Sequence, residues 1–182
     1  MIMSKKILVI SASPRKGGNS DALCDEFIRG ATDAGNDAEK IFLRDQKINY
    51  CLGCEACTSN GGQCVQKDDA PEIIDKMTAA DVIVFSTPVY FYSMAAQMKA
   101  LIDRSVGRYT EISNKDVYFI ITAADSNKEN MQPTINALRG YTEMCLDGTN
   151  EKGIIYGIGV WKKGEINKKP SMKDAYEAGR KA

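Results

Sequence analysis

The chain has 182 residues, 43% hydrophobic and 26% charged, which suffices for one globular domain with a substantial core. Its 24 basic and 24 acidic residues cancel, which argues against a nucleic-acid partner or an anionic membrane surface. It contains no histidine, which excludes a Ser-His-Asp triad, a Cys-His pair and any metal site with histidine ligands.

No targeting signal is visible near the N-terminus. The basic and then apolar stretch MIMSKKILVI ends within a few residues, and the sequence contains no run of about eighteen apolar residues. We therefore expect a cytoplasmic protein without a membrane span, in which thiols stay reduced. Clustered cysteines in that setting indicate metal or redox chemistry more often than disulfide bonds.

Short apolar runs alternate with amphipathic stretches in the first half of the chain. Four consecutive aliphatic residues within 5–13 predict a strand buried on both faces, and a helix is expected over 20–34. Segment 37–45 predicts a weaker, charged strand that suits a sheet edge. A cysteine-rich insertion loop at about 45–68 comes next. The helix after it is expected to have Asp69 as its N-cap.

The same alternation continues to the C-terminus. Strands are expected at 81–90, 116–125 and 153–161, with helices between them. Cys24 and Cys145 fall at helical positions, and we expect both to be buried packing residues. The lysine-rich stretch that follows the last strand predicts a solvated segment, which leads into a short C-terminal helical tail.

This pattern predicts one α/β domain over 1–182, a flavodoxin-like doubly wound fold with a five-stranded parallel sheet and helices on both faces. Strand order 2-1-3-4-5 puts the charged second strand at an edge. In such sheets ligands bind beyond the carboxyl ends of the strands, beside the switch point between strands one and three. Functional residues are therefore expected in the loops after strands one, three and four.

The loop after the first strand, SASPRKGGNS, has the composition of an anion site. Hydroxyl and amide donors, glycines and an arginine lead directly into a helix N-terminus, which attracts a phosphate. The loop has neither the Walker A spacing nor G-x-G-x-x-G, so a monophosphate is favoured over a dinucleotide. The alternative is a plain Gly/Ser turn with an N-cap. The predicted phosphate contacts are Ser11, Ser13, Arg15, Gly18, Asn19 and Ser20.

The loops after the third and fourth strands predict contacts to a planar ring. STPVYFYSM gathers a proline and three aromatic residues at a strand end, and TAADSN is small and polar, so a ring could lie against its backbone. The alternatives are core packing, for Tyr92 above all, and a plain loop. A phosphate site and a ring site together indicate FMN at the switch point. The predicted ring contacts are Pro88, Val89, Tyr90, Phe91, Ala123, Ala124 and Asp125.

These two loops together resemble the flavodoxin-like NAD(P)H-dependent FMN reductases, and CLGCEACTSNGGQCVQKDD resembles the iron–sulfur flavoproteins of anaerobes. The resemblance extends from Lys5 to about Val160. It implies an FMN-dependent oxidoreductase that takes electrons from NAD(P)H or a redox partner and passes them to a small-molecule or protein acceptor. The flavin would carry the chemistry, so no catalytic side chain is named. Assembly as a homodimer or homotetramer is also implied.

Four cysteines with the spacing C-x2-C-x2-C-x6-C are the candidate metal ligands: Cys51, Cys54, Cys57 and Cys64. The first three resemble the bacterial ferredoxin run that holds a [4Fe–4S] cluster, and Cys64 is within reach of the fourth corner. The resemblance to iron–sulfur flavoproteins implies such a cluster. Free or redox-active thiols near the flavin, zinc and a purely structural role remain as alternatives.

Two other functions are open on the sequence alone. A flavodoxin-type electron carrier would not turn over a substrate, although such carriers usually present an acidic surface and this chain is neutral. A quinone or nitro-compound reductase without a cluster is the other.

Overall fold

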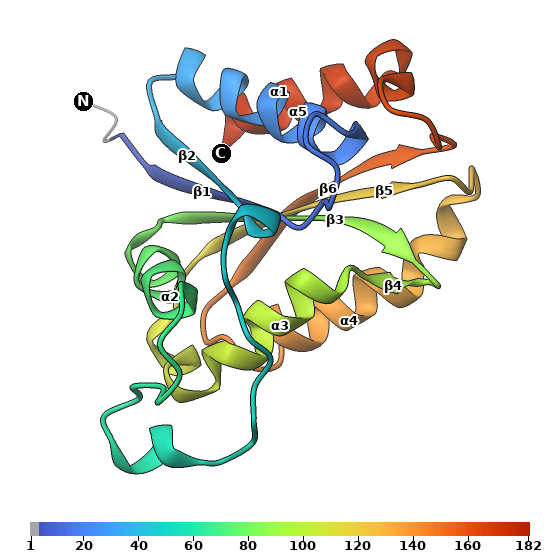
Figure 1. The fold of residues 1–182 in the computed structure, drawn as a ribbon. Helices are drawn as coiled ribbons and strands as arrows, with labels where there is room; N and C mark the ends of the chain where they lie inside the picture. Colours follow the sequence, from blue (N-terminus) through green and yellow to red (C-terminus); the bar gives the residue numbers. More distant parts are fainter. Residues whose placement is uncertain (1–3) are drawn as a thin grey trace.

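The five predicted strands form one parallel sheet in the computed structural model, which describes residues 4–182 (Figure 1). Their order, β2-β1-β3-β5-β6, confirms the predicted topology, with the charged strand β2 at one edge. A two-residue strand, β4 (Ser93–Met94), pairs antiparallel with the end of β3 and was not predicted. The parallel strands are β1 (Lys6–Ser11), β2 (Asp37–Phe42), β3 (Val82–Tyr90), β5 (Asp116–Ala123) and β6 (Asn150–Ile158).

Helices cover both faces of the sheet, as predicted (Figure 1). One face carries α1 (Asn19–Asp33) and α5 (Ser171–Lys181), and the other carries α2 (Ala70–Ala79), α3 (Ala96–Arg104) and α4 (Gln132–Thr142). Successive side chains of a strand point to opposite faces, so the sheet builds two hydrophobic cores. Within β1, Ile7 and Val9 pack toward α1, whereas Leu8 and Ile10 pack toward α2 and α3.

Six short 3-10 segments connect these elements. They are η1 (Leu43–Asp45), η2 (Ala56–Ser59), η3 (Ser105–Gly107), η4 (Tyr109–Glu111), η5 (Lys128–Met131) and η6 (Glu165–Lys168). Within residues 4–182, no helix combines the length and the apolar character needed to cross a membrane.

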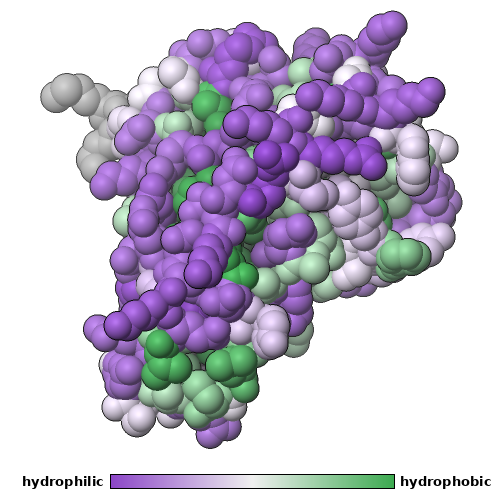
Figure 2. All heavy atoms as spheres, viewed as in Figure 1, coloured by the Kyte–Doolittle hydropathy of each residue, from purple (hydrophilic) through white to green (hydrophobic). Residues whose placement is uncertain are grey.

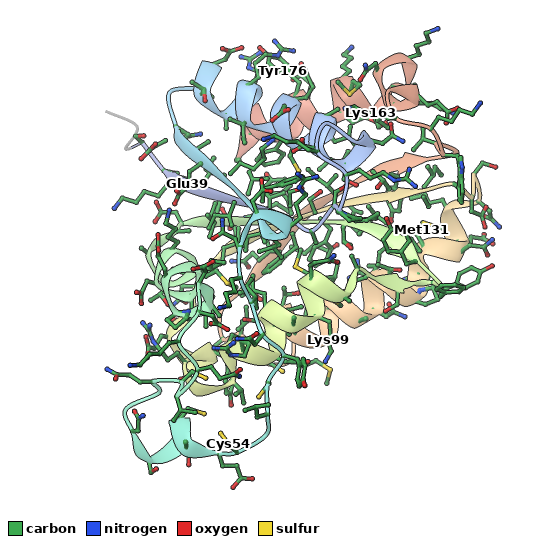
Figure 3. The ribbon with its side chains drawn as sticks, in the orientation of Figure 1. Glu39, Cys54, Lys99, Met131, Lys163 and Tyr176 are labelled. Atoms are coloured by element: carbon green, nitrogen blue, oxygen red, sulfur yellow. The ribbon has the colours of Figure 1, made fainter. Side chains whose placement is uncertain are left out.

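The C-terminal helix α5 packs closely against α1 through two glycines. A Cβ atom on Gly30 would lie 2.0 Å from the carbonyl oxygen of Tyr176, and one on Gly179 would lie 2.0 Å from that of Phe27. The two backbones therefore touch where the helices cross. Figure 3 shows Tyr176 in this upper layer, on the sheet face opposite the cysteine-rich loop.

Two sequence-based predictions need correction. Helix α4 ends at Thr142, so Cys145 lies in the turn after it and is exposed, whereas Cys24 is buried as predicted. Strand β6 begins three residues earlier than predicted, at Asn150. Its first residues are polar, and an edge strand with one open side tolerates such residues.

Candidate functional site

The carboxyl ends of β1, β3 and β5 bring the three predicted loops together. Ser11 pairs with Ser86 in the sheet register, and Pro88 pairs with Thr122. The phosphate loop, the aromatic turn and the loop after β5 therefore share one edge of the sheet. This is the edge where ligands bind in doubly wound folds.

The loop between β1 and α1 is a tight polar turn at this edge. Ser11 is fully buried, and its Oγ has no hydrogen-bond partner among residues 4–182. Ser13 Oγ accepts the backbone N–H of Arg15 at 3.2 Å. Gly18 lets the loop turn closely on itself, because a Cβ there would lie 2.9 Å from the carbonyl oxygen of Arg15 and 3.4 Å from Ser13 Oγ. The N–H groups of the first turn of α1 have no acceptor within the helix, which suits an anion.

Ser20 and Asn19 are already hydrogen-bonded in this loop. Ser20 Oγ lies 2.5 Å from Thr122 Oγ1 on β5. The side-chain amide of Asn19 donates to the carbonyl oxygen of Lys162 at 3.0 Å and accepts the N–H of Gly164 at 3.1 Å. Asn19 thus ties the loop to the segment after β6, and its backbone N–H is the group that remains for a phosphate.

The segment after β6 covers the phosphate loop, which was not predicted from the sequence. Arg15 donates to the carbonyl oxygen of Trp161 at 3.1 Å, and Lys163 Nζ donates to that of Lys16 at 3.1 Å. Figure 3 shows Lys163 above the N-terminal end of α1. Although most of this lysine-rich segment is exposed, it contacts the site. Its place just after a parallel strand was the signal that could have revealed it.

The aromatic turn after β3 is a tight hairpin with strained backbone. Phe91 and Tyr92 have φ angles of 50° and 61°, in the left-handed region that glycine or asparagine usually fills. The ring of Phe91 is fully exposed and that of Tyr92 more than half exposed, so Tyr92 does not pack into the core as expected. Thr87 Oγ1 accepts the N–H of Ala95 at 2.8 Å and anchors the hairpin from inside. Strain of this kind persists where the surrounding structure imposes it, which is common at ligand sites.

The loop after β5 is held by one carboxylate. Asp125 accepts the N–H of Asn127 at 2.8 Å and the side-chain amide of Asn130 at 2.6 Å. These bonds, with the Asn127 N–H first, hold the pKa of Asp125 below its usual range. Asp125 is therefore an ionised structural group. Ala123 is buried at the strand end, whereas Ala124 is exposed beside it.

The residues at this edge fit the two ends of FMN. The unpartnered Ser11 Oγ and the free N–H groups of the first turn of α1 suit a phosphate, and the exposed aromatic turn suits a flat ring. Pro88 and Val89, near the end of β3, are half-buried.

The clustered cysteines line a separate cavity of about 520 Å³. All four border it, and Cys145 borders it as a fifth thiol. Figure 3 shows Cys54 at the tip of a loop that projects from the α2 and α3 side, away from Met131 at the carboxyl edge. Figure 2 shows hydrophobic residues at this tip, where Leu52 and Val65 are more than half exposed.

The clustered thiols are the type of ligand that an iron–sulfur cluster or zinc requires, but they are not arranged in a metal-binding geometry. All six cysteines are free. Within residues 4–182, no group of three or more Cys, Asp or Glu side chains is arranged to hold a metal ion as it stands. Four thiols around one cavity suit iron–sulfur clusters or zinc by their chemistry, and their sulfur atoms would have to converge on binding.

Two aspartates close the base of the cysteine loop. Asp69 occupies the N-cap position of α2, as predicted, but its side chain makes no capping hydrogen bond. Its carboxylate instead accepts the N–H of Lys47 at 2.6 Å, and Asp68 accepts the N–H of Ala70 at 3.2 Å. Asp68 also forms a buried ion pair with Arg104 at the end of α3.

Comparisons with known proteins show the family and the fold of the chain. The family model described as NADPH-dependent FMN reductase matches residues 5–144. An iron–sulfur flavoprotein of Methanocaldococcus jannaschii is 42% identical over 159 residues, covering 84% of this chain and 80% of that protein. An iron–sulfur flavoprotein of Archaeoglobus fulgidus is 38% identical over 99 residues, covering 54% of this chain and 44% of that protein. The chain thus spans less than half the length of the Archaeoglobus relative.

A solved structure shares the whole fold. The NAD(P)H:quinone oxidoreductase from Methanothermobacter marburgensis superposes with a TM-score of 0.77 at 17% identity, covering 98% of this chain and 96% of that one. At this identity the likeness concerns the fold alone. The family match covers both the phosphate loop and the aromatic turn. The chain belongs to the NADPH-dependent FMN reductase family.

Proposed function

We propose that this protein is an FMN-dependent oxidoreductase that takes electrons from NAD(P)H or a redox partner and passes them to an acceptor. The observation that carries the proposal is the pairing of a polar loop, with its unpartnered Ser11 hydroxyl, and an exposed aromatic turn at one sheet edge. Membership of the reductase family supports it. Bound FMN would supply the hydride and electron chemistry.

The chain's own residues have binding and positioning roles in this proposal. Ser11, Ser13 and the backbone N–H of Asn19 would hold the phosphate, with Arg15 adding charge at the rim. The backbone from Pro88 to Phe91 and from Ala123 to Asp125 would orient the ring. The segment after β6, fixed by Asn19, would limit the access of water to the phosphate.

We further propose that Cys51, Cys54, Cys57 and Cys64 hold a [4Fe–4S] cluster. Their common cavity and the similarity to proteins named iron–sulfur flavoproteins support this proposal. Such a cluster would supply one-electron transfer. The exposed apolar tip beside the thiols would suit a protein partner in that exchange. Free thiols in the reduced cytoplasm are the competing interpretation.

A spectrum and an iron assay on protein purified without oxygen test both proposals. We expect flavin bands, a broad cluster absorption, about four irons per chain and oxidation of NADH or NADPH when a quinone is added. Flavin without iron, with quinone turnover intact, would favour the cluster-free reductase. Exchange with reduced ferredoxin but not with nicotinamides would favour a carrier. Protein that binds no FMN at saturation would overturn the function itself.

We also propose a homodimer or homotetramer. The exposed Phe91 and Tyr92 beside the ring site support an interface there, since exposed aromatic residues are enriched at protein contacts. Light scattering of the FMN-loaded protein measures the mass directly. A monomer at micromolar concentration would contradict this proposal.

A further inference from the structure

A fully buried ion pair lies beside the cysteine cavity. The side chains of Arg104 and Asp68 are 1% and 0% exposed, and they meet through two hydrogen bonds of 2.5 and 2.9 Å. Removing two charges from water has a large desolvation cost, so such a pair is weak evidence for stability by itself. Its geometry indicates what else it does.

The pair joins the two ends of the cysteine loop. Arg104 donates to the carbonyl oxygen of Asn49 at 3.0 Å, just before the first clustered cysteine. Asp68, just after the last one, accepts the N–H of Asn49 at 2.9 Å and its side-chain amide at 3.1 Å. One guanidinium and one carboxylate therefore fix both ends of the segment that carries all four thiols.

Arg104 also has a donor to spare. Its Nε is buried and has no hydrogen-bond partner among residues 4–182. Arg104 and Cys64 border the same cavity, where Arg104 is the one basic residue among the described lining residues.

The next residues extend this support. Gly107, three positions after Arg104, lies so close to the loop that a Cβ there would be 2.5 Å from the carbonyl oxygen of Gly62 and 2.8 Å from the Cβ of Cys57. The end of α3 and η3 thus form a platform under the loop. Arg104 is the basic member of that platform, next to the acidic Asp103.

We propose that Arg104 is a positioning residue for the metal centre, which fixes the cysteine loop and places a positive charge and a free Nε–H beside the Cys64 sulfur. The inference rests on the proposed cluster. Hydrogen bonds to the sulfurs and local charge set the potentials of iron–sulfur centres. A positive charge stabilises the centre after it gains one electron, so Arg104 would raise its reduction potential, and Asp68 would oppose it.

The test measures iron, sulfide and the one-electron midpoint potential of protein reconstituted without oxygen and titrated with dithionite. We expect Arg104→Gln to shift the potential to more negative values and Asp68→Asn to shift it to more positive values. Both variants should retain less iron than the wild type. A role limited to folding would lower iron in both without opposite shifts in potential.

Two further variants serve as controls: Arg104→Lys tests the role of the charge, and Arg139→Gln removes a comparable ion pair elsewhere. Lysine keeps the charge but loses the two-armed contact and Nε, so its potential should lie between those of the wild type and Arg104→Gln. Arg139 forms a similar two-armed pair with Glu151, at 2.7 Å for each bond, away from the cavity. Arg139→Gln should leave iron and potential unchanged. FMN content in every variant reports whether the domain is folded.

The outcomes separate the two proposals. Wild-type protein that takes up no iron and sulfide overturns the cluster assignment and this inference together. A loaded wild type, with Arg104→Gln and Arg104→Lys equally loaded and at the wild-type potential, overturns this inference alone. Potentials that shift in the same direction in Arg104→Gln and Asp68→Asn also overturn it. If Arg104→Gln and Arg104→Lys both lose iron while binding FMN, and Arg139→Gln is loaded, the positioning role is supported.

Discussion

Gly18 matters at the residue scale because it lets the loop after β1 turn tightly. Gly18→Ala should weaken FMN binding about tenfold, since a Cβ 2.9 Å from the carbonyl oxygen of Arg15 would push apart the loop proposed to hold the phosphate. The dissociation constant follows from the quenching of FMN fluorescence during titration.

Gly140 provides the control for that variant. No atom lies within 4 Å of a Cβ built on it, and it sits inside helix α4. Gly140→Ala should keep the wild-type FMN affinity and stabilise the fold by up to about 1 kcal/mol. Equal affinities in both variants would show that the phosphate lies elsewhere.

The thiol of Cys24 predicts a loss of stability in alkali. Burial raises its pKa from 9.0 to about 12, with the nearby Ser86 hydroxyl opposing this. The unfolded chain releases the thiol proton above pH 9, while the folded chain keeps it. The stabilising contribution of the buried thiol to the free energy of unfolding is therefore complete below pH 9 and lost as pH rises toward 12. Urea unfolding at pH 7.5, 9 and 10.5 should show a decline of up to about 1.4 kcal/mol per pH unit from this group.

Cys24→Ala should make that decline shallower between pH 9 and 10.5. The cavity left by the missing sulfur lowers stability by a similar amount at every pH, so only the slope is diagnostic. Burial also raises the pKa of Tyr141 to about 12, so its stabilising contribution to the fold falls in the same way from pH 10 upward. The Cys24→Ala substitution leaves this contribution unchanged. Identical slopes in the two proteins would contradict the assignment to Cys24.

Only residue roles that depend on local sequence can be proposed from the sequence. The run of Ser, Gly and Arg in loop one predicts an anion site, because backbone donors and small residues are local features. Arg104 and Cys145 could not be placed in that way. Arg104 acts through Asn49 and Asp68, more than thirty residues away, and Cys145 became exposed because α4 ends three residues before it.

At the scale of elements, the β3–β4 hairpin predicts a conflict between stability and binding. Phe91 and Tyr92 both adopt positive φ, at a cost of about 1 kcal/mol or more each. Replacing the pair by Asn-Gly, the preferred sequence for such a turn, should raise the free energy of unfolding by about 1–2 kcal/mol. The same change should weaken FMN binding, because the ring loses an aromatic contact.

Chemical unfolding and flavin titration on one preparation measure both effects. A variant that gains stability and keeps its FMN affinity would show that the turn conformation serves another purpose, such as contact between chains. The aromatic content of this turn was predictable from the sequence, but its strain was not. Pattern alone does not force two bulky residues into the left-handed region.

The α1–α5 crossing carries a second prediction at this scale. Gly179→Ala should destabilise the protein by about 1–3 kcal/mol, because its Cβ would overlap the backbone of Phe27. Gly140→Ala again serves as the matched helical control. A neutral Gly179→Ala would mean that α5 shifts away from α1 at little cost.

For the whole molecule, topology was the most predictable feature. Buried apolar strands, a charged edge strand and right-handed crossovers leave few arrangements, and the order found is the predicted one. The position of the cysteine loop was not accessible in this way. It leaves the sheet after β2 and folds beneath α3, where long-range contacts with Arg104 and Gly107 hold it (Figure 1).

This separation of the two sites predicts that they load independently. Helix α3 runs from the end of the β3–β4 hairpin to the cysteine cavity, and its nine residues span about 14 Å. Changes more than about 10 Å apart usually add within about 0.5 kcal/mol. Cys57→Ser should therefore lose most of its iron and keep an FMN dissociation constant within about twofold of the wild type.

Gly18→Ala should give the converse result, with weaker flavin binding and a full complement of iron. Iron assays and flavin titrations on both variants, reconstituted under the same anaerobic conditions, complete the comparison. If Cys57→Ser also lost flavin affinity, the two sites would have to meet. Because they lie apart within one chain, that result would require the cysteine loop of one chain to reach the flavin edge of another. The affinity of Cys57→Ser should then depend on protein concentration.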